Sequence, residues 1–149
     1  MILHVASPAE LDVRTLYSLL CLRCDVFVVE QRCPYPDLDG RDLEPGTRHL
    51  WLAPGGNPAE PHAYLRLLAE RDGSARIGRV CTAEKARGGG HSARLVASAL
   101  DLVGDRPSVL DAQAYLVGFY ERLGFRVSGP EYVEDGIPHV PMHRVVSPR

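Results

Sequence analysis

The stretch IGRVCTAEKARGGGHSARLVASALDLV, residues 77–103, combines an extended run, a glycine-rich turn and an amphipathic helix. Residues 77–82 carry the β-branched side chains that are typical of a strand. After the glycines, apolar residues recur at helical spacing, namely Leu95, Val96, Ala99, Leu100 and Val103. Glycines at the start of a helix leave backbone N–H groups uncovered at its positive end, which suits a phosphate or a diphosphate. The stretch therefore predicts a turn that binds a nucleotide-type cofactor.

Two common phosphate-binding motifs can be compared with this turn. A P-loop requires Gly-Lys-Ser/Thr at the end of the turn, whereas Lys85 precedes the glycines here. A dinucleotide fingerprint, G-x-G-x-x-A, fits from Gly88 to Ala93, and Asp111 lies 18 residues further on. However, residues 83–86 separate the strand from the first glycine, and that motif requires a tight turn directly after the strand. An NAD-type nucleotide-binding domain stays open as an alternative.

A third pattern is a Val-x-Thr strand end followed by Arg-x-x-Gly-x-Gly/Ala, which here reads Val80-Cys81-Thr82 and Arg87-Gly88-Gly89-Gly90-His91-Ser92. It resembles the coenzyme A diphosphate loop of the GNAT N-acetyltransferases. Ser92 stands where that family prefers Gly or Ala, but serine is small and also caps helices well. The resemblance implies that the N–H groups from Arg87 through Ala93 hold the diphosphate of acetyl-CoA. It also implies that the backbone of Val80, Cys81 and Thr82 pairs with the pantetheine arm.

The composition is that of an ordinary globular protein. The 149 residues carry a net charge of −2 and are 45% hydrophobic and 24% charged, so nothing favours nucleic-acid binding. The length suits a single domain spanning residues 1–149. No apolar run approaches the roughly 20 residues that cross a bilayer, and the opening MILHV does not resemble a signal peptide. We expect a cytoplasmic protein that binds neither nucleic acid nor membranes.

The four cysteines give little reason to expect a metal site or a disulfide. Cys21 and Cys24 form one C-x-x-C pair, but no second pair completes a zinc site. Both fall in an expected helix, where they suit the core or its boundary, and stable disulfides are rare in a reducing compartment. We therefore expect no bound metal.

Caps, turns and alternation predict a mixed α/β (α+β) chain. Ser7, Pro8 and Glu10 form a capping box that begins a helix running to about residue 24. Residues 26–31 continue as a second, short helix, and the prolines and glycines of residues 31–46 predict a loop. The last helix covers residues 116–123, and the expected strands are 2–5, 49–53, 62–68, 77–82, 108–111, 125–128 and 139–146.

This order predicts a mostly antiparallel central sheet with helices on both faces, including an antiparallel meander of residues 49–53, 62–68 and 77–82. It is also the element order of the GNAT acyl-CoA N-acyltransferase fold. Three further segments resemble one branch of that family, the ElaA-like proteins. They are LRCDVFVVEQRCPY (22–35) with DLDG (37–40), AQAYL with FY and GF (112–125), and EDGIPHVPM (134–142).

The resemblance implies a catalytic acid. Tyr120, next to Phe119, matches the tyrosine that many GNAT proteins place beside the cofactor's sulfur, where a phenol donates a hydrogen bond or a proton to the leaving thiolate. A tyrosine that packs the core beside Phe119 is the alternative. For the base, Glu30 ranks first, as base or substrate ligand, and His139 second. His49 is a third candidate, but a lone histidine at the start of a strand is more often structural.

The amine substrate is expected on the opposite side from the diphosphate. Five acids, Glu30, Asp37, Asp39, Asp42 and Glu44, cluster around the 31–46 loop, either as an acidic lip for an ammonium group or as a solvated loop. Arg23 is expected to bind a substrate carboxylate or to pair with a nearby acid. The remaining expected substrate contacts are Gln31, Tyr35, Asp39 and Gln113.

The leading hypothesis is an acetyl-CoA-dependent N-acetyltransferase that acts on a small-molecule or peptide primary amine by direct attack in a ternary complex. A non-catalytic acyl-CoA-binding sensor with the same fold is an alternative, as is the NAD-type domain. A homodimer through sheet edges would be unsurprising.

Overall fold

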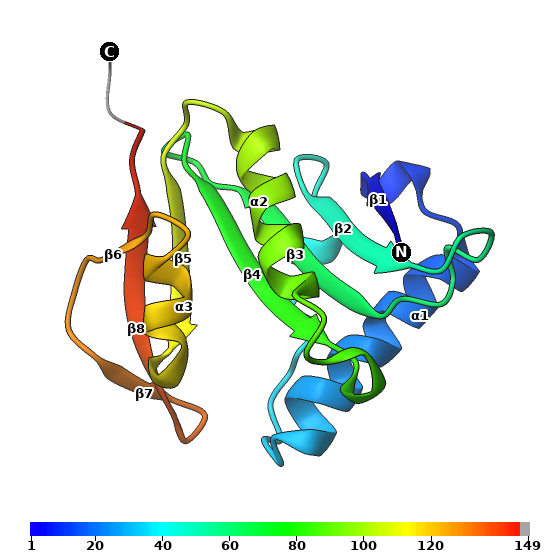
Figure 1. Ribbon diagram of the computed structural model, residues 1–149, viewed down its shortest axis with the longest axis horizontal. Coiled ribbons are helices and arrows are strands. Elements are labelled where there is room, and N and C mark those ends of the chain that lie inside the picture. Colours follow the sequence, from blue (N-terminus) through cyan, green and yellow to red (C-terminus); the bar gives the residue numbers. More distant parts are fainter. Residues whose placement is uncertain (147–149) are drawn as a thin grey trace.

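The computed structural model of the chain describes residues 1–146, and its central feature is one eight-stranded sheet (Figure 1). Residues 147–149 of the expected domain lie outside this range. The strand order is β1-β2-β3-β4-β5-β8-β6, with β7 paired to β8, and only β4 and β5 run parallel. The strands are β1 (Ile2–Ala6), β2 (Arg48–Ala53), β3 (Ala63–Ala69), β4 (Ala75–Thr82), β5 (Ser108–Gln113), β6 (Arg126–Val127), β7 (Tyr132–Glu134) and β8 (Ile137–Arg144).

Helices cover both faces of this sheet, as predicted. α2 and α3 pack against one face and α1 packs against the other. The helices are α1 (Val13–Cys24), α2 (His91–Val103) and α3 (Val117–Glu121), and α1 continues into the π-helical η2 (Asp25–Glu30). Four 3₁₀ turns complete the structure: η1 (Pro8–Glu10), η3 (Arg41–Leu43), η4 (Glu84–Ala86) and η5 (Ala114–Leu116).

Two hydrophobic cores fill the space between the sheet and its helices. Leu50 and Leu52 of β2 pack with side chains of α2, whereas Trp51 and Ala53 pack with side chains of α1. Successive side chains of a strand point to opposite faces, so this single strand serves both cores. Each buried leucine contributes about 1.5–3 kcal/mol relative to an exposed one, so β2 stabilises the packing on both faces of the sheet.

The start of the first helix differs from the prediction. Pro8–Glu10 form only a 3₁₀ turn, and the chain extends again before α1 begins. The carboxylate of Asp12 accepts a hydrogen bond from Thr15 N–H at 2.7 Å and caps α1. The Glu10 carboxylate accepts from Ser7 N–H at 2.9 Å, so the predicted box closes a turn and not a long helix.

The antiparallel meander is confirmed as β2, β3 and β4. Residues 26–31, expected as a second helix, fall almost entirely within η2, which follows α1 without a break. The strand β7 was not predicted, because three exposed residues are too few to show alternation. None of the helices within residues 1–146 combines the length and the apolarity that crossing a bilayer demands.

Candidate active site

The strands β4 and β5 separate toward one end (Figure 1), and residues of both strands line a cleft there. The two parallel strands pair only at Ala75–Ser108 and Arg76–Val109, and beyond these pairs they diverge. The cleft has a volume of about 1050 Å³, enough for a large ligand. Predicted residues of the cofactor side and of the amine side line this one cavity, among them Val80, Thr82, Gly88, Gly90, Gln113, Tyr120 and His139.

The edge of β4 that faces the cleft offers free backbone groups. Ala83 N–H donates to His62 C=O at 2.8 Å, so the adjacent pair Ala63–Thr82 is of the non-hydrogen-bonded type. The N–H and C=O of Thr82 therefore point away from β3 and toward the cleft. Alternation turns the backbone of Cys81 toward β3, so Cys81 lines the cleft without offering its amide to it. This corrects the expectation that all three residues 80–82 present free amides.

The glycine-rich turn places uncovered N–H groups at the start of α2. Gly88 and Gly90 have left-handed φ angles of 89° and 74°, which glycine adopts without a Cβ penalty. Gly90 is the N-cap, so the N–H groups of His91, Ser92 and Ala93 have no partner within the helix. A Cβ on Gly88 or Gly90 would meet nothing within 4 Å, so the turn faces open space. This arrangement suits a diphosphate.

Side chains also shape the turn. A Cβ on Gly89 would lie 3.1 Å from Nε2 of His91, so the imidazole lies directly against this glycine. The hydroxyls of Ser92 and Thr82 are hydrogen-bonded at 2.9 Å and tie the start of α2 to the end of β4. The expectation that Ser92 caps α2 is wrong, because Gly90 is the N-cap and makes no side-chain bond.

Arg87 links the turn to the opposite wall of the cleft. Its Nη2 donates to Oε2 of Glu30 at 2.7 Å, and its Nε donates to the C=O of Thr82 at 3.1 Å. The Arg87 side chain is 46% exposed and that of Glu30 is 33% exposed. The carboxylate of Glu30, ranked first as the base, is therefore occupied by an ion pair in this state.

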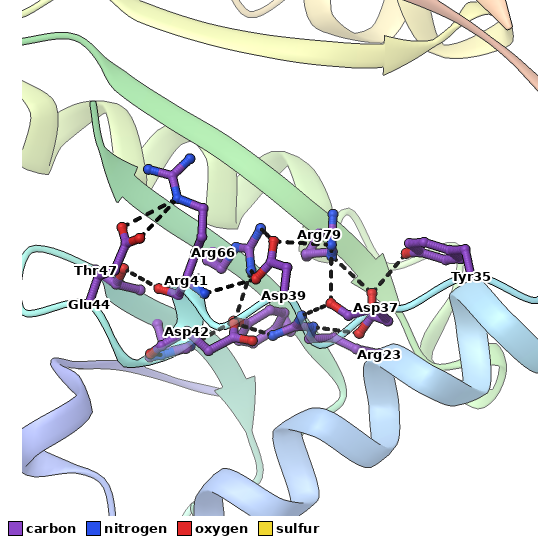
Figure 2. A network of polar contacts seen from close by, with 12 residues as sticks. Arg23, Tyr35, Asp37, Asp39, Arg41, Asp42, Glu44, Thr47, Arg66 and Arg79 are labelled. Carbon is purple, nitrogen blue, oxygen red and sulfur yellow. Dashed lines mark hydrogen bonds and ion pairs between the residues drawn. The ribbon is translucent and has the colours of Figure 1, made fainter. Parts of the chain in front are cut away.

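A β-bulge in β4 directs the guanidinium of Arg79 toward the 31–46 loop (Figure 2). The register passes from Tyr64–Cys81 to Arg66–Gly78, which leaves one extra residue in β4, and Arg79 there has a φ of 53°. A left-handed φ costs a non-glycine residue about 1–2 kcal/mol. The Arg79 guanidinium forms ion pairs with Asp37 at 2.9 Å and with Asp39 at 3.5 Å, and these contacts offset the cost.

Arg23 is completely buried and binds acids of this loop. Its Nε and Nη2 donate to Oδ2 and C=O of Asp37 at 3.1 and 2.9 Å, and its Nη1 donates to Asp42. Arg66 donates to both oxygens of Asp39 at 2.8 and 3.0 Å, and to Asp42 at 3.2 Å (Figure 2). For Arg23 the structure supports the expected pairing with a nearby acid over a substrate contact, and the expected substrate contact of Asp39 is corrected to an internal ion pair. Asp37, Asp39 and Asp42 therefore form neither an acidic lip for an ammonium group nor a solvated loop, which were the two expected alternatives.

Asp39 and Tyr35 both belong to this network of ion pairs and hydrogen bonds around the 31–46 loop, and both have shifted pKa values. Burial opposes ionisation of Asp39, but hydrogen bonds from Arg66 and from Arg41 N–H outweigh it and lower its pKa to about 2. Tyr35 lines the cleft, and its hydroxyl donates to Oδ1 of Asp37 at 2.8 Å. Burial, and then this bond, raise the pKa of Tyr35. The network thus holds Tyr35, one of the expected substrate contacts, in place at the cleft.

Tyr120 is packed in the core and also lines the cleft. Its ring packs edge-on against Phe119 at 5.0 Å and Phe125 at 6.1 Å within the main core. Tyr120 also lines the cleft, and its hydroxyl has no hydrogen-bond partner within residues 1–146. Burial raises its pKa to about 12, so the phenol stays protonated at neutral pH and is available as a donor.

His139 lies in β8 with a defined tautomer. Its Nδ1 is 2.8 Å from the C=O of Ile137, and because a carbonyl only accepts, Nδ1 carries the hydrogen. In the neutral imidazole, Nε2 then carries the lone pair. Its register partner on β5 is Gln113, whose Nε2 donates to Oε1 of Gln31 at 3.3 Å. The expected residues Gln31, Gln113 and His139 are therefore brought together in the cleft.

Several residues around the site were missed or misplaced by the sequence patterns. The ion pairs of Arg66 and Arg79 could have been predicted from sequence, because cations inside apolar strands require buried acidic partners. Tyr132 had no such signal, because it meets His139 only through β7–β8 pairing. His49 is completely buried between Tyr64 and the backbone of Asp42, which supports a structural role.

The diverging parallel pair, the free edge of β4 and the glycine turn at the start of α2 together define the site class of acyl-CoA N-acyltransferases. Residues 41–146 match the family described as "Acetyltransferase (GNAT) domain". ElaA of Escherichia coli is 44% identical over 144 residues, which cover 93% of this chain and 92% of ElaA. A UPF0039 protein of Mycobacterium tuberculosis is 56% identical over 139 residues, covering 91% of this chain and 87% of that protein.

Solved structures agree with these relatives. The crystal structure of E. coli ElaA superposes with a TM-score of 0.88 at 40% identity, covering 96% of this chain and 98% of ElaA. An acyl-CoA N-acyltransferase from Pseudomonas aeruginosa gives a TM-score of 0.87 at 42% identity, covering 97% and 100%. The chain belongs to the GNAT acetyltransferase family and is ElaA-like, which confirms the predicted family and fold. Membership supports acyl transfer from an acyl-CoA in general.

Proposed function

We propose that this protein, as one GNAT domain over residues 1–149, is an acetyl-CoA-dependent N-acetyltransferase that acetylates a small-molecule or peptide primary amine by direct attack in a ternary complex. One observation carries the proposal: a single cleft is lined both by the glycine turn and by Tyr120, Gln113 and His139. A diphosphate-binding end and two proton-transfer groups in one cavity are what acyl transfer to an amine requires.

The residues present fit acetyl-CoA. The N–H groups of residues 87–93 bind the diphosphate, and His91 adds a donor near it. The Arg87 side chain joins them only when it leaves Glu30 and Thr82. The free edge of β4 at Val80 and Thr82 pairs with the amides of the pantetheine arm, while Cys81 and Phe119 line the wall. Bound there, acetyl-CoA supplies an acetyl group already activated as a thioester, so the protein's main contribution is positioning.

Tyr120 serves as the acid on the cofactor side. Its phenol is protonated, since burial raises its pKa to about 12. The core contacts with Phe119 and Phe125 fix the ring, so its hydroxyl is held at the cleft. Against a thiolate whose pKa is ordinarily about 8.5, such a weak acid stabilises the leaving sulfur chiefly by hydrogen bonding.

His139 serves as the base on the amine side, ahead of Glu30. The bond to Ile137 presents Nε2 as an acceptor, and imidazole is the commonest general base near neutral pH. Glu30 is committed to Arg87 and acts as a cleft residue and substrate contact. Gln31, Tyr35 and Gln113 complete the contacts to the amine or to a water that relays its proton.

The test is release of free thiol when the purified protein is mixed with acetyl-CoA and a panel of primary amines. We expect amine-dependent thiol release that falls sharply in Tyr120→Phe and His139→Gln. CoA binding by calorimetry without thiol release from any amine would instead indicate the acyl-CoA sensor. Thermal stabilisation by NAD and not by acetyl-CoA would contradict the cofactor assignment.

A further inference from the structure

His139 stands in the middle of a row of three side chains that crosses the sheet. Its register partner on β5 is Gln113, and its register partner on β7 is Tyr132. Directly paired residues of antiparallel strands project their side chains from the same face. The row therefore places one unassigned residue, Tyr132, against the imidazole.

The contact between Tyr132 and His139 is a stack. The ring centroids are 5.7 Å apart and the planes are inclined by 21°. The bond from Nδ1 to Ile137 defines the tautomer of His139 only while the ring keeps this orientation, because rotation of the ring breaks the bond. A stacked neighbour removes that rotation, so the two contacts together set the direction of Nε2.

The hydroxyl end of the Tyr132 ring lies near Asp111. Burial, followed by interaction with this carboxylate, raises the pKa of Tyr132. Asp111 accepts from Nη1 of Arg76 at 2.7 Å. Arg76 belongs to one of the two residue pairs that hold β4 and β5 together, so Asp111 is held at the root of the cleft.

We propose that Tyr132 is a positioning residue that holds His139 with Nε2 directed at the amine. The proposal rests on the assignment of His139 as the base. Tyr132 moves no proton itself, because its contact with His139 is a stack of rings and not a hydrogen bond.

Within residues 1–146, the titratable groups on the two strands paired at His139 are Asp111 on β5 and Tyr132 and Glu134 on β7. Asp135 follows in the β7–β8 turn, where its C=O accepts from Sγ of Cys33 at 3.0 Å, and Tyr115 of η5 also lines the cleft. Of these, Asp111 is neutralised by Arg76. Tyr132→Phe changes no charge at neutral pH, and Tyr132→Leu removes the stack without adding a charge.

Measurements of kcat and KM distinguish a positioning role of Tyr132 from a general effect on the fold. A general base is worth about 10²–10⁴-fold in rate, and we expect Tyr132→Leu to lose about tenfold in kcat through misdirection of the imidazole. Tyr132→Phe keeps the stack and should lose less. The KM for acetyl-CoA should not change in either variant. In a His139→Gln background, Tyr132→Leu should no longer lower kcat. If Tyr132 were merely structural, its replacement would lower kcat in that background as well. Tyr17→Phe, on the exposed face of α1, is the matched control.

A second measurement does not depend on catalysis. The ¹⁵N shifts of the His139 ring report its tautomer, and we expect the Nδ1–H form in the native protein and in Tyr17→Phe, with averaged shifts in Tyr132→Leu. If the ring shifts are the same in Tyr132→Leu as in the native protein, the positioning role is overturned, whatever the base is. If the ring shifts change but His139→Gln turns over at the native rate, the positioning stands and the assignment of the base fails.

Discussion

Replacing Glu30 with glutamine should tighten the binding of CoA, although it removes a predicted catalytic residue. The carboxylate of Glu30 holds Arg87, whose Nε also occupies the C=O of Thr82 at 3.1 Å. That carbonyl points toward the cleft, so a pantetheine amide that pairs with it must first displace Arg87. Without Glu30, Arg87 is free to leave the β4 edge and to approach the diphosphate.

The magnitude follows from the exposure of the pair. With side chains 46% and 33% exposed, the Arg87–Glu30 ion pair is in the class worth about 0.2–1 kcal/mol. Since about 1.4 kcal/mol corresponds to tenfold in affinity, Glu30→Gln should lower the Kd for CoA by about 1.4-fold to 5-fold. Isothermal titration calorimetry with CoA measures this directly, and high salt should shrink the difference.

A double-mutant cycle isolates the contact. In an Arg87→Gln background, most of the gain from Glu30→Gln should disappear, because the pair no longer exists. Glu134→Gln is the matched control, since Glu134 also lines the cleft but makes no ion pair with Arg87. Weaker CoA binding by Glu30→Gln would refute the reasoning. An equal gain in CoA affinity from Glu30→Gln in the Arg87→Gln background would refute it as well.

The remaining predictions concern the turn, the acid and the charge network. Gly90→Val should raise the Kd for CoA severalfold, because its side chain enters the open space before the turn, whereas Gly73→Val, with a similar φ of 90° and open surroundings, should be destabilised without that effect. Tyr120→Phe should lower kcat at least severalfold in the thiol-release assay while CoA affinity by calorimetry stays the same. Asp42→Asn should reduce the free energy of unfolding in urea by about 3–5 kcal/mol, because it breaks buried pairs. Asp39 titrates at about 2 when folded and near 3.9 when unfolded, so its stabilisation is present above about pH 4 and is lost as the pH falls toward 2. Urea unfolding of Asp39→Asn should therefore show a weaker dependence on acid.

The features predictable from sequence are those that local chemistry determines. The glycine turn was recognisable because Gly88 and Gly90 mark left-handed backbone directly before an amphipathic helix. The meander was recognisable from short, mainly apolar runs bounded by turn residues, as in β2. Tyr120 was found through a family motif and not through periodicity, since burial among Phe119 and Phe125 looks like ordinary core packing.

The features that sequence could not supply depend on distant segments meeting. Arg23 looks like a helix surface residue until the 31–46 loop brings Asp37 to it, 14 residues later in the chain. The loss of Glu30 as the leading base follows from an ion pair with a residue 57 positions away. Tyr132 gains its place only when β7 pairs with β8. No local sequence pattern indicates such contacts.

The central claim is that the cleft between β4 and β5 binds an acyl-CoA with its diphosphate on the glycine turn. A crystal structure of the protein soaked with CoA tests this most directly. We predict density that runs along the open edge at Thr82 to the N–H groups of residues 87–93, with the thiol near Tyr120. CoA bound at another surface, or an empty turn at saturating CoA, would contradict the account.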